Sequence, residues 1–228
     1  MYSVILEHIS KSYLNGDSEL NILDDASYCF EKGKFYCIVG RSGLGKTTLL
    51  NIIGGFEKNN EGSIVLCNHN LSDVNSKKLD IIRRHDLGFV FQNFSLIERY
   101  SVYDNLDIPL YFSGVKSRKK RNEIIKQSLS MVGLSEKCLY QQSKLLSGGE
   151  QQRVAICRAL INNPTVILAD EPTGNLDEEN ENNIINIFLD TIKDRNRTII
   201  MVTHNNNIAK KADVLLTLHH GKIVEIGE

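Results

Sequence analysis

The stretch "GRSGLGKT", Gly40 to Thr47, decides the fold of this chain. The apolar run "FYCIVG" (35–40) leads into it and is typical of a buried parallel strand. The run "KTTLLNIIGGF" (46–56) follows and predicts a helix that stops near its two glycines. The stretch matches G-x-x-x-x-G-K-[ST] at every fixed position and in the expected strand-loop-helix setting. We therefore predict a phosphate-binding loop rather than a glycine-rich turn with an incidental lysine.

The residue types in this loop suit a nucleoside triphosphate. Gly40, Gly43 and Gly45 let the backbone bend so that successive N–H groups point at an anion. The helix that follows adds a partial positive charge at its start. We expect Lys46 to reach the β- and γ-phosphates and the Thr47 hydroxyl to hold Mg²⁺. The other loop residues expected to contact the nucleotide are Arg41, Ser42, Leu44 and Thr48.

A second stretch, "VILADE" (166–171), places four apolar residues before two carboxylates. This pattern predicts a buried central strand that ends at the carboxyl edge of the sheet, where ligands bind. Asp170 is then suited to the metal shell, directly or through water, and Glu171 to polarising an attacking water as general base. A merely charged strand end before Pro172 is the alternative, and the phosphate loop disfavours it.

A third stretch, "LSGGEQQR" (146–153), also begins a helix. Ser147 and Glu150 have the spacing of a capping box, so a well-capped helix is one interpretation. However, a cap does not require Gly148 and Gly149, which we expect to leave first-turn N–H groups exposed to an anion. Because the first loop already encloses its own nucleotide, the simplest ligand here is the γ-phosphate held by another subunit.

The rest of the chain alternates strand and helix patterns. Helical periodicity dominates between about 95 and 160, which predicts a helical lobe inserted into a parallel sheet with crossover connections. The expected strands are 3–10, 21–34, 35–40, 62–68, 87–92, 165–170, 197–204 and 213–227, and the expected helices are 46–56, 102–112, 120–134, 149–163 and 178–193.

Composition excludes several classes of function. The net charge is −1, which does not favour nucleic acid or an anionic membrane surface, and the basic run "KSRKKR" (116–121) is typical of a solvated helix start. The five cysteines are an odd number without CxxC spacing, so we expect neither a disulfide framework nor a zinc site. No segment approaches the ~20 apolar residues of a transmembrane helix.

The ordered motifs resemble ABC-type ATPase domains. These motifs are the phosphate loop, Gln92, "LSGGEQQR", "VILADE", "GNLD" (174–177) and "TH" (203–204), and the resemblance runs from Tyr13 to the C-terminal strands. It implies an α/β phosphate-loop NTPase core with a mostly parallel sheet, an N-terminal antiparallel β subdomain and an inserted helical lobe. We expect one ATPase domain over 1–228, with the core and β subdomain in 1–92 and 160–228 and the lobe in about 93–159.

The resemblance also assigns roles to single residues. It implies that Tyr13 stacks on adenine and that Gln92 touches both Mg²⁺ and the attacking water. Asp177 would cross to the opposite subunit, a role compatible with capping the helix that follows. His204 would contact the γ-phosphate as a switch. Without the resemblance, other interpretations would be preferred. Tyr13 would be a surface packing residue, Gln92 a polar cap of its strand, and His204 an ordinary histidine at a strand end.

Partners follow from the same resemblance. Two copies would pair head to tail with two ATP molecules between them, and a permease in a separate chain would cross the membrane. This implies a cytoplasmic protein, peripheral on the inner face of the cell membrane. The segment after Gln92 could line a groove for a permease helix, or form the inner face of the lobe. Its apolar residues are Phe94, Leu96, Ile97, Tyr100, Val102 and Tyr103.

The transport class competes with a soluble ABC ATPase that acts on nucleic acid or the ribosome. That class usually carries two such domains or a coiled-coil insertion, which this chain lacks. A non-hydrolysing regulatory protein is disfavoured because Glu171 and His204 are both present. "LADEPTGNLD" (168–177) is similar to macrolide exporters, lipoprotein-release ATPases and bacteriocin or antimicrobial-peptide exporters, and "EKGKFYCIVGRSGLGKTTLLNIIGG" (31–55) to bacteriocin exporters in particular.

Three residues depart from the family pattern without removing a catalytic group. Leu44 replaces a small polar residue in the phosphate loop, where the backbone supplies most contacts. Cys157 replaces a frequent alanine, which we expect to be a packing detail. Asn205 stands after His204 where an acidic residue is common.

Overall fold

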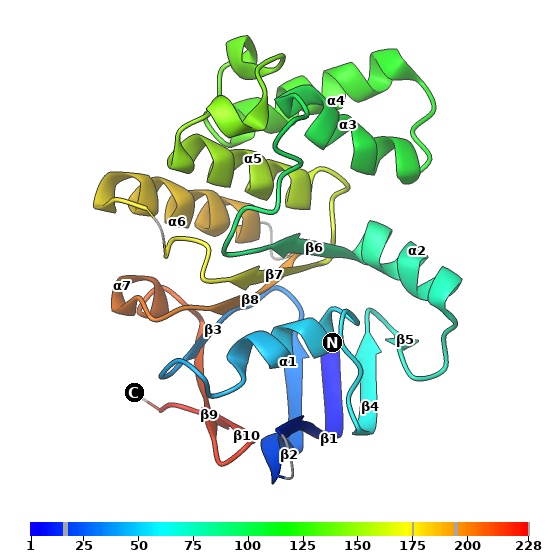
Figure 1. The fold of residues 1–228 in the computed structure, drawn as a ribbon, viewed down its shortest axis with the longest axis vertical. Helices are drawn as coiled ribbons and strands as arrows, with labels where there is room; N and C mark the ends of the chain where they lie inside the picture. The colour runs from blue at the N-terminus through cyan, green and yellow to red at the C-terminus, as the bar shows by residue number, and fades with distance from the viewer. Residues whose placement is uncertain (16–17, 175, 194–195, 228) are drawn as a thin grey trace.

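A computed structural model describes residues 1–15, 18–174, 176–193 and 196–227. Over these residues the chain forms two sheets and a group of helices at one end (Figure 1). The first sheet is antiparallel, in the order β2-β1-β4-β5. Its strands are β1 (Tyr2–Asn15), β2 (Ser18–Glu31), β4 (Glu61–Leu66) and β5 (His69–Asn70). This sheet is the predicted N-terminal antiparallel subdomain.

The second sheet is the core, in the order β10-β9-β3-β8-β7-β6. Its strands are β3 (Phe35–Val39), β6 (Leu87–Val90), β7 (Val166–Asp170), β8 (Thr198–Val202), β9 (Val214–His219) and β10 (Lys222–Glu225). All neighbours are parallel except β10, which runs antiparallel to β9. The central strands are apolar because helices cover both faces. The carboxyl ends of β3, β7 and β8 therefore meet at one edge, where the loops after them converge.

Helices complete the fold. Between β6 and β7 the chain is helical, and α3, α4 and α5 gather at one end of the molecule in Figure 1. The predicted α/β class with an inserted helical lobe is confirmed. None of the helices in the described parts of the chain is both long and apolar enough to span a bilayer. The helices are α1 (Lys46–Ile53), α2 (Ser76–Asp86), α3 (Val102–Phe112), α4 (Arg118–Met131), α5 (Gly148–Leu160), α6 (Glu178–Ile192) and α7 (Asn206–Ala209), with 3-10 turns at Glu136–Cys138 and Ser143–Leu145.

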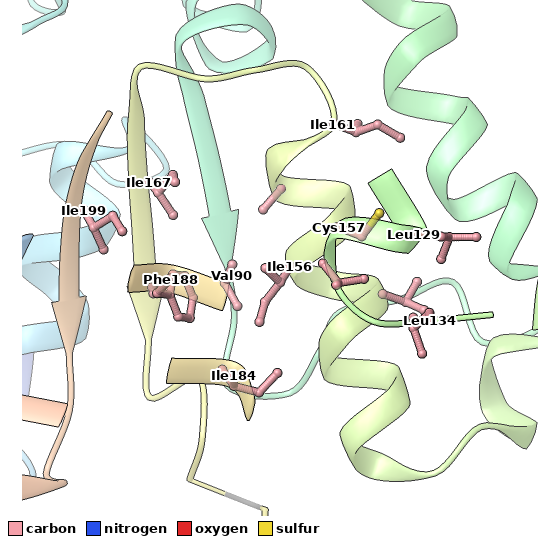
Figure 2. Close-up of a cluster of buried hydrophobic side chains, with 14 of the residues drawn as sticks. Val90, Leu129, Leu134, Ile156, Cys157, Ile161, Ile167, Ile184, Phe188 and Ile199 are labelled. Atoms are coloured by element: carbon pink, nitrogen blue, oxygen red, sulfur yellow. The ribbon is translucent and has the colours of Figure 1, made fainter. Parts of the chain in front are cut away.

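One apolar cluster joins the core sheet to the helical lobe (Figure 2). Ile167 and Ile199 project from the sheet toward Phe188 of α6, and Ile156 of α5 lies beyond them. The same cluster continues to Leu129 of α4. Burying each such aliphatic side chain contributes about 1.5–3 kcal/mol, so α5 and α6 are fixed on the sheet by continuous packing.

Candidate active site

The phosphate loop is held in shape by glycine. Gly45 caps α1 with φ 90°, in the left-handed region that glycine adopts without strain. A Cβ at this position would also lie 2.2 Å from Cγ2 of Ile22, a side chain on β2. Both the backbone angle and the neighbour thus require glycine here. The loop consequently presses against the antiparallel sheet, which contributes one wall of the site.

Lys46 is folded back into its own loop. Its Nζ donates to the carbonyl oxygens of Gly40 and Arg41, each at 2.8 Å, and the residue is 7% exposed. The two carbonyl oxygens accept from two of its three N–H groups without neutralising its charge. A buried ammonium group is costly without an anionic partner. The loop is therefore built to receive an anion.

Thr47 and Asp170 bring two oxygen donors together. The Thr47 hydroxyl donates to Oδ1 of Asp170 at 3.2 Å, joining the start of α1 to the end of β7. Burial raises the pKa of Asp170, the Thr47 hydrogen bond opposes this, the charge of Glu171 raises the pKa further and Lys46 lowers it. Hydroxyl and carboxylate oxygens are the donors that Mg²⁺ prefers, and Mg²⁺ takes its remaining ligands from phosphate and water. The donor set therefore fits Mg²⁺.

Glu171 and His204 form the other side of the site. Nδ1 of His204 lies 2.7 Å from Oε2 of Glu171. The Glu171 backbone is left-handed with φ 45°, and its N–H donates to the carbonyl of Val202 at 2.9 Å. The Glu171 side chain is only 16% exposed, whereas that of His204 is 70% exposed. The carboxylate is thus held in place at the sheet edge while the imidazole faces solvent.

Lys46, Thr47, Glu171 and His204 line one cavity of about 420 Å³, within the size range of small-molecule sites. Its described lining does not include the predicted site residues Gly40, Arg41, Leu44 and Asp170. Gln92 also lines the cavity, from a turn that lies beyond the end of β6 at Val90, so the expectation that Gln92 ends the strand is wrong by two residues. The sequence did not indicate Ile22 or Val202, because an isolated apolar residue carries no ligand signal. The residues lining the cavity are Ile22, Ser42, Gly43, Gly45, Lys46, Thr47, Thr48, Gln92, Glu171, Val202 and His204.

The second glycine-rich helix start does not join this cavity, as far as the described lining residues go. Ser147 accepts from the Glu150 N–H at 3.3 Å, and the Ser147 N–H donates to Glu150 Oε2 at 2.9 Å, which confirms the capping box. Gly148 is exposed and Gly149 is buried, so only Gly148 lies open to a ligand in the way expected of a pair that leaves first-turn N–H groups exposed. A Cβ on Gly149 would lie 2.3 Å from Oδ1 of Asn180, and this packing explains the glycine.

Asp177 caps the N-terminus of α6. Its carboxylate accepts from the Asn180 N–H at 2.9 Å and also from the Asn180 side-chain amide. Arg153 of α5 donates to Oδ1 of the same Asn180 at 3.2 Å. Asn180 therefore links the motif around Asp177 to the helix that begins at the second glycine-rich start. Asn175 of the "GNLD" motif lies outside the described residues.

The three departures have simple places in the structure. Leu44 is 41% exposed, so the loop accommodates it without burying it. Cys157 is 1% exposed within the core cluster, as the packing interpretation predicts (Figure 2). Asn205 caps α7 by accepting from the N–H groups of Asn207 and Ile208 at 2.7 and 3.3 Å, which gives the unusual residue a structural role.

Comparison with known proteins agrees with the motifs. The family model described as "ABC transporter" matches residues 23–174. The lipoprotein-releasing system ATP-binding protein LolD of Rickettsia felis is 42% identical over 218 residues, covering 96% of both chains. The macrolide export ATP-binding/permease protein MacB of Bdellovibrio bacteriovorus is 41% identical over 218 residues. The matched region covers 96% of this chain and 33% of MacB.

The fold has close solved relatives. The dimeric post-hydrolysis structure of the ATP-binding cassette MJ0796, bound to ADP and Pi, matches with a TM-score of 0.91 and 35% identity over 99% of both chains. The cbiO1 protein of Clostridium perfringens, part of the cbiONQ transporter complex, matches with a TM-score of 0.81 and 26% identity, covering 98% of this chain and 87% of that one. This chain therefore belongs to the ABC transporter family, as an ATP-binding cassette that hydrolyses ATP.

Proposed function

We propose that this chain is the ATPase subunit of a membrane transporter that exports a peptide, drug or lipid-like substrate through a separate permease. One observation carries the proposal. Phosphate-loop residues, Glu171 and His204 meet around a single cavity, and Asp170 accepts a hydrogen bond from Thr47 at its edge, whereas Ser147 caps a helix outside the described lining. This arrangement supports one nucleotide-binding half-site together with a separate, differently built helix start.

In this proposal the hydrolytic residues divide the work. Glu171 is the general base that takes a proton from the attacking water, and Gln92 orients that water. His204, hydrogen-bonded to Glu171, is placed to contact the γ-phosphate. Lys46 neutralises phosphate charge. Thr47, Asp170 and Gln92 would hold Mg²⁺, which would supply electrostatic stabilisation of the phosphate oxygens.

The second helix start is proposed to act on the partner's nucleotide. Ser147, Gly148, Gly149 and Glu150 would close over an ATP held by a second copy in a head-to-tail dimer, and Asp177 would cross the same interface. The dimeric state of MJ0796 supports a paired assembly. A monomer should then bind ATP but hydrolyse it poorly. ATP acts as part of the interface, so hydrolysis loosens it.

A groove lined in part by Phe91, the residue before Gln92, is the proposed permease contact. It measures about 330 Å³ and combines the aromatic side chains of Phe89 and Phe91 with Arg84, Pro109 and Arg158. Arg158 donates to the carbonyl of Ser95 at 2.6 Å, which ties the segment after Gln92 to α5. A short permease helix with an apolar face and an acidic residue fits this lining.

The apolar residues named from the sequence contribute less to that groove than expected. Val102 is completely buried, and Leu96 and Tyr103 pack against the core, so these three form the inner face of the lobe. Ile97 and Tyr100 are 45% and 48% exposed. The proposed contact therefore rests on the groove rather than on the inner face of α3.

The substrate class and the location follow from the relatives. These include ATPases named for lipoprotein release and macrolide export, and the resemblance of 31–55 to bacteriocin exporters adds antimicrobial peptides. A cytoplasmic chain at the inner face of the membrane follows from a permease partner. The alternative of a soluble ATPase on nucleic acid or the ribosome is not favoured by these relatives or by the net charge of −1.

Two measurements test the proposal. The specific ATPase activity of the pure chain should rise with protein concentration, because hydrolysis needs two copies, and Lys46→Ala should abolish ATP binding. Coexpression with the membrane protein encoded in the neighbouring reading frame should move the chain into the membrane fraction, whereas Arg84→Glu should reduce this. Activity independent of concentration, or no membrane association in the presence of that protein, would contradict the proposal.

A further inference from the structure

Tyr13 lies near the end of β1, at the edge of the nucleotide cavity. Its hydroxyl lies 3.5 Å from Oγ1 of Thr48, which lines that cavity. The residue is 38% exposed, so part of its ring is open to a ligand. Lys11 precedes it by two positions on the same strand, so the two side chains share a face.

Glu57 fixes the far end of the ring. The Tyr13 hydroxyl donates to Oε1 of Glu57, a side chain just beyond α1. The Glu57 N–H donates to the carbonyl of Asn51 at 3.2 Å, so its backbone is tied to α1. The same helix begins at Lys46 of the phosphate loop. One rigid element therefore connects the phosphate-binding loop to the group that orients Tyr13.

Lys11 holds the ring from a second direction. Its Nζ lies 3.0 Å from Oε1 of Glu57 and donates to the carbonyl of Lys58 at 2.9 Å. The same ammonium lies over the Tyr13 ring, 4.9 Å from the centroid. A cation at this distance attracts the electron-rich face of the ring. The ring is thus held at its hydroxyl and at one face.

The protonation states agree with this geometry. Burial and the hydrogen bond to Glu57 both raise the pKa of Tyr13, so its hydroxyl stays protonated. Burial acts to raise the pKa of Glu57, but the hydrogen bonds from Tyr13 and Lys11 outweigh it and lower that pKa. At neutral pH a phenol donor therefore faces an ionised acceptor, and such charge-assisted bonds are stronger than neutral ones.

We propose that Glu57 and Lys11 are positioning residues that hold the Tyr13 ring ready to stack on the adenine base of ATP. The inference rests on the proposed role of the site in binding ATP, and it adds two residues that no family motif named. A ring that is already oriented does not lose rotamer freedom when the base arrives. Freeing it should weaken ATP binding by ~3- to 10-fold, the range that one immobilised side chain represents.

A merely structural role makes a different prediction. If Glu57 only fixes β1 against α1, its loss would disturb the phosphate loop. The binding of any ligand that carries phosphates would then become weaker. A positioning role concerns the base alone. Inorganic tripolyphosphate has the phosphates of ATP without the base, so it separates the two roles.

The test is calorimetric titration with Mg²⁺ and either ATP or tripolyphosphate. Glu57→Ala and Tyr13→Phe should each raise the Kd for ATP ~3- to 10-fold, and the double variant should raise it no further, because both changes free the same ring. Tripolyphosphate binding should stay within about twofold of the wild type in all three. Glu7→Ala is the matched control, since Glu7 binds Ser63 at 2.9 Å on the same sheet.

Several outcomes would overturn the inference. The first is a Kd for ATP that is unchanged or lower in Glu57→Ala or Tyr13→Phe. The second is an equal loss of affinity for ATP and for tripolyphosphate. The third is a double variant whose Kd for ATP shows the two effects added in full. If Glu57→Ala does not fold, Tyr13→Phe and Glu57→Gln decide the question. Failure of the proposed function would look different from failure of this inference. The wild-type protein would then bind neither ATP nor tripolyphosphate, or Lys46→Ala would bind both as well as the wild type does.

Discussion

Nδ1 of His204 lies 2.7 Å from Oε2 of Glu171, although 33 residues separate them in the chain. Parallel pairing of β7 with β8 creates this contact, because Asp170 is opposite Val202 at the ends of the two strands. The next residues of each strand therefore leave the sheet side by side. The pair couples a partly buried carboxylate to an exposed imidazole that a ligand can reach.

Glu171→Gln should trap the ATP-bound state. The amide keeps the shape of the carboxylate but cannot accept a proton from water, so kcat should fall by ~10²- to 10⁴-fold. ATP affinity should remain near the wild-type value, and the variant should run as a stable dimer with ATP and as a monomer without it. Size-exclusion chromatography with and without Mg-ATP measures this. A monomer in both conditions, with ATP binding intact, would argue against the paired assembly.

His204→Ala should lower turnover much more than it lowers ATP affinity. The imidazole holds Oε2 of Glu171 in place, and it is 70% exposed, so its removal should leave the fold intact. We expect a loss of kcat on the order of 10²-fold, as for other groups that act in the chemical step. Steady-state kinetics and calorimetry on the same sample give both quantities. His219→Ala is the control histidine, and an equal loss there would remove the specific role of His204.

The main features of the fold could be predicted, because its strongest signals are local. The apolar runs of β3 and β7 and the glycine-rich loop are contiguous in sequence. The sequence did not predict the helix α2. Only Ile82 of that helix is buried, so its apolar residues show little helical periodicity. The contacts of Gly149 with Asn180 and of Tyr13 with Glu57 could not be predicted either, because each joins segments whose spacing depends on the folded sheet.

Gly149 and Gly148 should respond differently to the same substitution. A Cβ on Gly149 would overlap Asn180 at 2.3 Å, whereas the nearest atoms to a Cβ on Gly148 are 3.9 Å away. Gly149→Ala should therefore cost about 1–3 kcal/mol and lower Tm, and Gly148→Ala should not. Adding Asn180→Ala to Gly149→Ala should recover most of the loss. Thermal melts of the three variants decide this, and equal melting of Gly148→Ala and Gly149→Ala would contradict the packing.

A bulky residue at Gly149 should separate ATP binding from turnover. In Gly149→Leu with Asn180→Ala, the phosphate loop is untouched, so the Kd for ATP should be nearly unchanged. Turnover should be abolished, because the added side chain is directed at α6 and should displace the helix start that is proposed to contact the partner's γ-phosphate. Calorimetry and a phosphate-release assay measure the two properties. Loss of ATP binding would instead mean that this helix start contacts the nucleotide held by its own chain.

The capping box at Ser147 should make part of the stability depend on pH. Hydrogen bonds from the Ser147 N–H and hydroxyl lower the pKa of Glu150. A carboxyl group with a lowered pKa stabilises the fold above its ordinary pKa near 4.5, and this contribution is lost as the pH falls through the folded value.

Ser147→Ala removes the cap, costs about 1 kcal/mol and should lower Tm by roughly 2–4 °C at pH 7. Melting curves from pH 7 to pH 3 should show the difference shrinking below about pH 4.5. Ser135→Ala, which removes the cap of a 3-10 turn without a partner carboxylate on its N3 residue, should show no such pH dependence.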